Sequence, residues 1–528
     1  MVGFFKKKVS CHLILISVIA ILACLLAFLL GRHRGFNLAD EGFLWYGVER
    51  VLRGEVPIRD FSSYDPGRYY WAAFWLWLSG TQGAVAVRTA TMMFFASAVV
   101  LAARAVWLQS SDRTTVRYLL AMVAVAWFLV WMIPWWKSYD AAISILLVLS
   151  LGHALAQPQP KRLFLHGLVV GLAAVFGRNH GLYGLVACFL SIPFVFRPIG
   201  RPSRLRVTAA WAAGILIGYM PMLGWLVFDH QFHVMFWDGI RFILFEYKGT
   251  NLPLPVPWPW RVSFAQDFWM VAWQLAIGLL FFALPLFCIV GIAVVSIRHA
   301  RRSSIPPLFL ACVLTAIPYT NVAFSRADMA HLAQAIYPGM IGFLVWPASR
   351  NDRVRWRLAI IAVLTILSLL AALPMHPGFM SRLQGNWRVA DIGGEHLVVD
   401  AATARSVKAI QTLSSRHGVP PATMVTAPVW PGAMAMLHAR SAAWEIYPLV
   451  PRNESFQRQE IARVADARPG LIFILDIAVD GRPELRYSAT HPLIWQYVHD
   501  HYLELPPDRD LPGVSTFVPR VQSTNGNR

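Results

Sequence analysis

Two adjacent carboxylates, Asp40 and Glu41, follow the first long apolar run of the chain, Leu13–Leu30. A carboxylate within hydrogen-bond reach of a hydroxyl group can accept its proton and make the oxygen a nucleophile. Acidic residues at the start of a helix also have a structural role, because they complement the helix dipole and accept hydrogen bonds from free N–H groups. A helical pattern follows the pair and ends at Gly54. Both roles are therefore open for this pair.

Charged side chains also occupy three short links between later apolar runs. They are Lys137 and Asp140 in the first link, Arg178 and His180 in the second, and Arg326 and His331 in the third. Arg and Lys bind phosphate, but at the end of a membrane helix they can also simply anchor it at the interface. The histidines could bind phosphate or assist an acceptor, or could be hydrogen-bonded helix ends. One basic residue on every short link favours a shared anionic ligand.

The elements that must position these residues are membrane helices. The chain is 57% hydrophobic and only 14% charged, with a mean hydropathy of +0.50, which excludes soluble, disordered and coiled-coil classes. A spanning helix needs about 20 mainly apolar residues. The predicted spans are 13–30, 84–107, 118–134, 140–156, 163–177, 181–197, 207–228, 268–297, 305–323, 332–347 and 358–374. The apolar piece Tyr69–Leu78 is shorter and predicts a helix lying at the interface.

The net charge is +19, and the distribution of the basic residues among the loops predicts the orientation. Basic residues cluster in alternate loops, whereas the three short links carry one each, so the links face outward by the positive-inside rule. The N-terminus is then cytoplasmic and the C-terminus outside. No small-residue cleavage site follows the first span, so we expect that span to be retained. The positive charge is an orientation signal and does not indicate nucleic acid.

Residues 1–374 are therefore predicted to form a transmembrane catalytic domain, with outer loops at 31–83 and 229–267. Residues 375–528 lose the apolar runs and predict an extracytoplasmic α/β domain. Its helix-like stretches are 401–417, 454–467 and 492–502, and its strand-like runs are 423–427, 471–476 and 514–518. Asp400 and Gly418 are the predicted caps of the first helix. The five cysteines show no CxxC or Cys/His pattern, which excludes a cysteine-based zinc site.

The loop after the first span resembles the first extracytoplasmic loop of the GT-C superfamily of polyprenyl-phosphate-sugar-dependent glycosyltransferases. The resemblance rests on Asp40-Glu41 directly after the first helix, the Tyr46 to Gly54 helix and the Asp60-Phe61…Asp65-Pro66-Gly67 turn. It extends to the topology of many helices, a long first outer loop and an outer C-terminal domain. Bacterial members similar to protein O-mannosyltransferases and the lipid A aminoarabinose transferase are the nearest relatives that it suggests.

This resemblance implies a glycosyltransferase that moves a sugar from a polyprenyl-phosphate donor to an acceptor hydroxyl at the outer face of the bacterial inner membrane. Asp40 would be the general base of a single inverting displacement, with Glu41 or Asp140 orienting it or the acceptor. The six basic side chains that would bind donor phosphate are Arg68, Lys137, Arg178, His180, Arg326 and His331. No cofactor is required; a divalent cation such as Mg²⁺ or Mn²⁺ is a weaker possibility, with Asp40, Glu41 and Asp140 as oxygen ligands.

Three alternatives stay open. The first is a metal-dependent oligosaccharyltransferase or glycan ligase that uses a diphosphate carrier. The second is a lipid-linked sugar flippase or transporter, although transporters commonly have repeated halves and charges near mid-membrane. The third is a silent scaffold that presents the outer domain. The sequence identifies neither the sugar nor the acceptor, which could be a glycan, a lipid or a protein.

Overall fold

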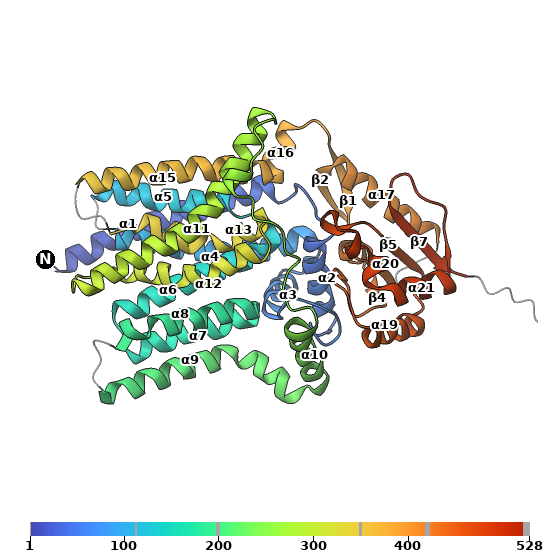
Figure 1. Cartoon of the computed structure of the whole chain (residues 1–528), viewed down its shortest axis with the longest axis horizontal. Coiled ribbons are helices and arrows are strands. Elements are labelled where there is room, and N and C mark those ends of the chain that lie inside the picture. The colour runs from blue at the N-terminus through green and yellow to red at the C-terminus, as the bar shows by residue number, and fades with distance from the viewer. Residues whose placement is uncertain (1, 111–112, 197–200, 348–350, 418–422, 521–528) are drawn as a thin grey trace, which may run out of the picture. The chain divides into compact units, whose positions relative to one another are not determined.

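A computed structural model describes residues 2–110, 113–196, 201–347, 351–417 and 423–520. The chain divides into two compact units (Figure 1). The first comprises residues 1–31, 89–230 and 250–380, and the second comprises residues 32–88, 231–249 and 381–528. Most of the predicted first outer loop therefore belongs to the same unit as the C-terminal tail.

The first unit is helical. Its helices are α1 (Val2–Gly31), α4 (Ala84–Gln109), α5 (Thr114–Val130), α6 (Ser138–Ala156), α7 (Pro160–Phe176), α8 (Arg178–Phe196), α9 (Arg201–Phe228), α11 (Phe268–Ala300), α12 (Pro307–Ser325), α13 (Met329–Ala335), α14 (Tyr337–Leu344) and α15 (Asn351–Ala372); α16 (Pro377–Leu383) leads out of it. Across the described ranges, eight helices are long and apolar enough to cross a membrane, so the protein is a multi-pass membrane protein.

Small residues let two of these helices approach closely. A Cβ atom on Gly167 of α7 would lie 2.3 Å from the carbonyl oxygen of Trp211, and one on Gly171 would lie 2.2 Å from that of Ile215. Gly214 and Gly218 of α9 face α7 in the same way. Paired small residues four apart bring helices together in a membrane, where apolar side chains give no hydrophobic driving force. This contact packs α7 directly against α9.

A single helix covers most of each of ten of the eleven predicted spans, and the exception is 332–347. There the chain forms two short helices, α13 and α14, that meet at Ile336. Pro338 stands in the first turn of α14, where its missing N–H is tolerated but would interrupt a continuous helix. Both pieces are buried, since Leu332 and Tyr337 are fully covered. The count of eleven crossings and the orientation stay predictions.

The second unit contains an α/β domain, as the sequence predicts. Its strands are β3 (Thr423–Ala427), β4 (Arg440–Ser441), β5 (Leu471–Leu475), β6 (Tyr502–Glu504) and β7 (Val514–Pro519), in the order β4-β3-β5-β7-β6. Pairing is parallel from β4 through β5 and antiparallel at β7 and β6. Its helices are α17 (Ala401–Arg416), α18 (Pro431–Met436), α19 (Glu454–Ala467), α20 (Tyr487–Thr490) and α21 (Pro492–His501). Asp400 caps α17 as predicted, and Gly418 lies outside the described residues.

Residues of the first outer loop complete this unit. They form α2 (Asp40–Leu52) and α3 (Gly67–Ser79), the latter being the predicted interfacial helix, while α10 (His230–Arg241) comes from the later loop. A hairpin, β1 (Trp387–Ile392) and β2 (Glu395–Asp400), turns at two glycines with φ of +64° and +83°. Arg34 bridges to Val398 on β2, and the Ser441 N–H donates to the Tyr46 hydroxyl over 2.8 Å. The loop and the tail therefore share one hydrogen-bonded structure.

Two glycines set the closest contact within this unit. A Cβ atom on Gly42 of α2 would lie 2.3 Å from the backbone of Gly432 on α18, and the Gly432 N–H donates to the Leu38 carbonyl oxygen over 2.8 Å. No side chain fits between the two backbones, so the tail is seated directly against the first turn of α2. That turn begins with Asp40.

Candidate active site

Asp40 stands at the first position of α2, on a turn fixed by its own backbone. The Asn37 side-chain oxygen accepts hydrogen bonds from the N–H groups of Ala39 and Asp40, each over 2.9 Å. The Asp40 side chain is half-buried. Within the described part of the chain, no hydrogen bond or ion pair is seen on its carboxylate. Asp40 is therefore held in place through its backbone, and its role as a general base stays a prediction.

Glu41 has different surroundings from its neighbour. Its side chain is 4% exposed and forms a bidentate ion pair with Arg88 of α4, which is 2% exposed. The Arg88 Nε and Nη2 groups donate to Oε1 and Oε2 over 2.6 and 3.0 Å, and the Asn37 N–H donates to Oε2 over 3.2 Å. A buried carboxylate held in this way is positioned to fix the loop. These contacts fit the structural role that the sequence left open for Glu41, and its catalytic role stays a prediction.

Asp140 lies in the first turn of α6, in the first unit, and is buried. Its Oδ1 is 2.8 Å from Nε2 of His180, and the other ring nitrogen, Nδ1, is 2.7 Å from the hydroxyl oxygen of Tyr319 on α12. A carboxylate on one ring nitrogen fixes the tautomer and orientation of a histidine. The structure thus joins two predicted site residues, Asp140 and His180, into a hydrogen-bonded chain that ends on Tyr319.

A second cluster in the first unit forms around Asp328. The Arg326 Nε donates to its Oδ2 over 2.7 Å, and Nδ1 of His331 lies 2.8 Å from its Oδ1. Burial alone would raise the pKa of Asp328, but the hydrogen bond and charge of His331 and the hydrogen bond of Arg326 lower it to about 2. Arg326 also donates to the Leu252 carbonyl oxygen over 3.0 Å. Arg326 and His331 are therefore fixed on either side of an ionised carboxylate.

The remaining predicted phosphate ligands lie at or directly before the start of an α-helix. Lys137 ends the short 3₁₀-helix η1 (Trp135–Lys137), Arg178 is the first residue of α8, and both are half-buried. Arg68, in the first turn of α3, is buried with its guanidinium 4.5 Å from the centre of the Tyr64 ring. That contact is a cation–π interaction, which holds Arg68 within the second unit. The phosphate-binding roles of these residues stay predictions.

The possible metal ligands were Asp40, Glu41 and Asp140. No group of three or more His, Cys, Asp or Glu side chains able to hold a metal ion occurs among the residues that the structure describes. Glu41 has both oxygens engaged by Arg88, and Asp140 has Oδ1 engaged by His180. Two of the three carboxylates, Glu41 and Asp140, are therefore held by basic side chains.

The sequence assigned no role to Arg88, Tyr319 or Asp328, which the structure shows as partners of predicted site residues. Arg88 left a usable signal, because it is an arginine inside the predicted span 84–107, and such a charge requires a partner. Asp328 lies two residues after Arg326, a spacing that could have indicated an ion pair. Tyr319 has no signal in the sequence, because a tyrosine in an apolar helix is ordinary. Only the three-dimensional packing places its hydroxyl at His180.

Comparison with known proteins decides the fold. No protein-family model and no curated protein matches the chain. Among solved structures, ArnT from Cupriavidus metallidurans bound to undecaprenyl phosphate is similar over 98% of this chain and 100% of its own, with a TM-score of 0.52 and 13% identity. The fold is GT-C-like.

Two further solved structures are similar at lower TM-scores. AglB, an archaeal oligosaccharyltransferase from Archaeoglobus fulgidus, has a TM-score of 0.48 at 11% identity, over 98% of this chain and 75% of its own. The arabinofuranosyltransferase AftD from Mycobacteria has a TM-score of 0.39 at 11% identity, over 94% and 41%. The GT-C-like fold confirms the polytopic architecture with a C-terminal α/β region that the sequence predicted.

Proposed function

We propose that this protein is a glycosyltransferase that moves a sugar from a polyprenyl-phosphate donor to an acceptor hydroxyl, at the outer face of the bacterial cytoplasmic membrane. The GT-C-like fold supports a transferase that acts with a lipid-linked donor. The ArnT structure with the same fold is bound to undecaprenyl phosphate, which is the carrier chemistry that this proposal requires. The tail would then lie on the outer side with the acceptor.

The observation that carries the proposal is the contrast between Asp40 and Glu41. Two adjacent carboxylates start the same helix, yet Glu41 is locked to Arg88 and Asp40 is half-exposed on a fixed turn. A general base must be accessible to the acceptor and fixed in position, because an unactivated hydroxyl is a poor nucleophile. Asp40 meets both requirements, and Glu41 meets only the second.

The reaction is a single displacement at the anomeric carbon. Asp40 takes the proton of the acceptor hydroxyl as its oxygen bonds to that carbon, and the bond to the phosphate oxygen breaks on the opposite face. The products are the glycoside with inverted configuration and the polyprenyl phosphate. The phosphate is a competent leaving group, so the protein has only to stabilise the charge that develops on it.

Basic side chains predicted to bind phosphate would stabilise that charge. Arg326 is the strongest candidate, because Asp328 and the Leu252 carbonyl hold its guanidinium in one orientation before a ligand arrives. A hydrogen-bond-donating group that is already oriented needs no reorganisation during the reaction. Lys137 and Arg178 would add positive charge. The Asp140–His180–Tyr319 chain would present a histidine of fixed tautomer to the substrates.

We further propose that no metal ion is required. The possible metal ligands support this, because they are already engaged. The Glu41 oxygens accept hydrogen bonds from Arg88 and Asn37, and Asp140 accepts one from His180. Binding a cation through Glu41 would break a buried ion pair, which is strongly unfavourable. Transfer should therefore continue in EDTA. Loss of transfer in EDTA and its recovery with Mg²⁺ or Mn²⁺ would favour the diphosphate-carrier alternative instead.

The proposed function is tested with the purified protein in detergent. Mass spectrometry of the lipid that co-purifies should find a polyprenyl monophosphate, with or without a sugar, and transfer to an acceptor extract should proceed without a sealed membrane. A protein that moves lipid-linked sugar only between the two sides of sealed vesicles, with no glycoside formed in detergent, would be a transporter. That result would overturn the proposal.

A further inference from the structure

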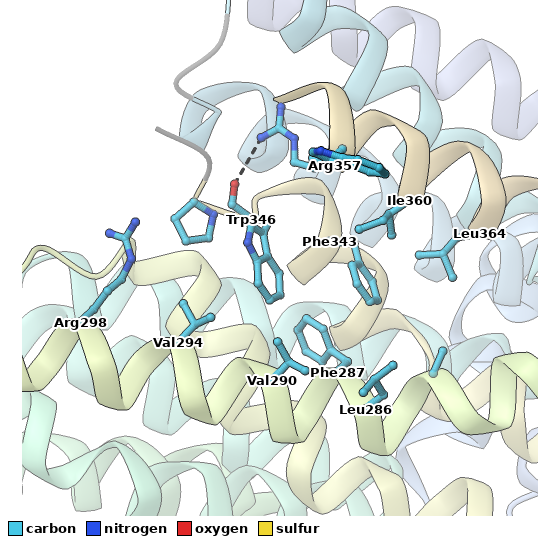
Figure 2. Close-up of a pocket in the computed structure, with 13 residues that line it drawn as sticks. Leu286, Phe287, Val290, Val294, Arg298, Phe343, Trp346, Arg357, Ile360 and Leu364 are labelled. Atoms are coloured by element: carbon cyan, nitrogen blue, oxygen red, sulfur yellow. Dashed lines mark hydrogen bonds between the residues drawn. The ribbon is translucent and has the colours of Figure 1, made fainter. Parts of the chain in front are cut away.

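An open apolar groove lies in the first unit between α11, α14 and α15. Its volume is about 620 Å³, within the range of roughly 300–1,000 Å³ that small-molecule sites have. Figure 2 shows the rings of Phe287, Phe343 and Trp346 gathered in its middle, and the Phe287 and Phe343 ring centroids are 5.1 Å apart. Aliphatic side chains of α11 and α15 complete the walls, and several of them, such as Leu286 at 45%, are exposed. The groove is thus open along a surface that would face lipid.

The groove is shorter than the hydrocarbon core of a bilayer is thick. Its lining on α11 runs from Ala283 and Leu286 to Arg298. Arg298 is fifteen residues after Ala283, so the lining on α11 covers about 22 Å at 1.5 Å per residue. The hydrocarbon core of a bilayer is about 30 Å thick. The groove therefore has room for acyl chain from one leaflet and does not run through the membrane.

Positive charge is concentrated at one end. Arg298 lies in the last turn of α11 and Arg357 near the start of α15, and Figure 2 shows both arginines towards one end, with Leu286 and Leu364 at the other. Backbone carbonyls hold them: Arg298 donates to that of Ser304 over 2.7 Å and Arg357 to that of Trp346 over 3.3 Å. No acidic residue is among the described residues that line the groove.

This end of the groove is separate from the candidate active site. In the predicted topology, the loop that follows Arg298 is cytoplasmic, whereas the Asp140–His180–Tyr319 chain belongs to the outer ends of its helices. Within the first unit, α12 starts at Pro307, shortly after Arg298, and reaches Tyr319 twelve residues later. At 1.5 Å per residue this is about 18 Å along the axis. The groove is therefore not part of the donor site.

We propose that this groove binds an anionic phospholipid of the cytoplasmic leaflet. One acyl chain lies along α11 and α15, over Phe287 and Phe343, and the phosphate lies at Arg298 and Arg357. Guanidinium groups bind phosphate oxygens in a bidentate manner, and basic sites between membrane helices on the cytoplasmic side suit anionic head groups. Trp346 and Trp356 also line the groove, and tryptophan is enriched at the interfaces of membrane proteins.

The full-length protein in nanodiscs tests this proposal. Nanodiscs contain phosphatidylcholine with or without phosphatidylglycerol, and native mass spectrometry counts the lipids that stay bound. We expect wild-type protein to retain one phosphatidylglycerol in preference to phosphatidylcholine. Arg298→Gln should reduce this preference about tenfold, since it removes a charged hydrogen-bond donor. Arg301→Gln, on the next turn and exposed, is the matched control and should bind as wild type.

A second pair of variants tests the acyl-chain part without changing charge. Val290→Trp fills the groove, whereas Ile289→Trp adds the same bulk on the adjacent exposed position of α11, outside the lining. We expect only the first to lose the bound phosphatidylglycerol. Equal retention of both lipids by wild type, unchanged binding in Arg298→Gln and Val290→Trp, or a retained lipid that proves to be the polyprenyl phosphate would each overturn the proposal.

Discussion

Arg88 holds both carboxylate oxygens of Glu41, with Nε 2.6 Å from Oε1 and Nη2 3.0 Å from Oε2. The same guanidinium donates to the backbone carbonyls of Arg32 and Gly35, each over 2.6 Å. Arg88, near the start of α4, thus fixes the backbone segment that precedes Asp40. Glu41 therefore fixes the loop through Arg88, whereas Asp40, the adjacent residue, has a half-exposed side chain.

Arg88→Met should destabilise the protein strongly. Breaking a buried ion pair by removing one partner costs about 3–5 kcal/mol, because it leaves a buried charge without compensation. The double variant Glu41→Leu/Arg88→Met removes both charges and should recover a large part of the loss. Denaturant unfolding of the detergent-purified variants measures both free energies. A single variant as stable as wild type would contradict the role given to this pair.

Gly42→Ala should destabilise the second unit. The added Cβ would lie 2.3 Å from the Gly432 backbone, so α2 and α18 must separate. Overpacking of this kind typically costs about 1–3 kcal/mol in the free energy of unfolding. Gly239→Ala is the matched control, because Gly239 is also helical and a Cβ there meets open space. That control should be neutral or stabilising by about 0.5–1 kcal/mol, and equal effects at the two glycines would refute the close contact.

Tyr319→Phe should reduce transfer about tenfold without altering the fold. It removes the hydroxyl that is 2.7 Å from His180 Nδ1, and so releases the ring that Asp140 holds at its other nitrogen. A lost hydrogen bond in a polar network is worth about a factor of ten in rate. Tyr183→Phe, which removes a hydroxyl bonded to Asn321, is the control and should leave the rate unchanged. Steady-state kinetics measure the transfer rate of both variants. A wild-type rate for Tyr319→Phe would mean that the hydrogen bonds of Asp140, His180 and Tyr319 take no part in the reaction.

Asp328→Asn should lower stability in a pH-dependent way. Burial opposes ionisation of Asp328, but His331 and Arg326 overcome it and lower its pKa from 3.8 to about 2. A lowered carboxylate pKa stabilises the folded state above the unfolded pKa, and this stabilisation is lost as the pH falls through the folded value. The difference in the free energy of unfolding between wild type and variant should therefore be largest near neutral pH and shrink below pH 3.8. Asn still caps a helix, so the substitution isolates the charge.

Thermal unfolding of wild type and Asp328→Asn at several pH values measures this difference. Asp267→Asn is a control, because it changes another N-cap aspartate away from Arg326 and His331. A difference for Asp328→Asn that stayed constant from neutral pH to about pH 2.5 would mean that the ion-paired charge does not stabilise the fold.

Much of the fold follows from local patterns. Runs of apolar residues are enough to place long membrane helices such as α11, and alternating patterns with an Asp400 cap place α17 and its neighbours in the tail. The predicted span 332–347 was different, because hydropathy averages over Pro338 and does not detect a break between two buried short helices. A break of this kind depends on packing against other helices.

The candidate site was predictable only in part. Asp40 and Asp140 were predicted from their places beside apolar runs and from the resemblance to the GT-C loop, and their roles stay predictions. Their partners were not, since pairs such as Glu41 with Arg88 are separated by dozens of residues and meet only through the fold. The grouping of the first outer loop with the tail likewise depends on a backbone contact between Gly42 and Gly432, for which no sequence pattern exists.

The rate of sugar transfer by Asp40→Asn tests the central claim most directly. The purified variant is assayed with the co-purified lipid donor beside wild type, and its folding is checked by thermal unfolding. Asn keeps the shape of the side chain but cannot accept the proton, so we expect transfer to fall by about 10²–10⁴ with the unfolding temperature unchanged. Transfer at the wild-type rate by a folded Asp40→Asn protein would contradict the assignment of Asp40 as the general base.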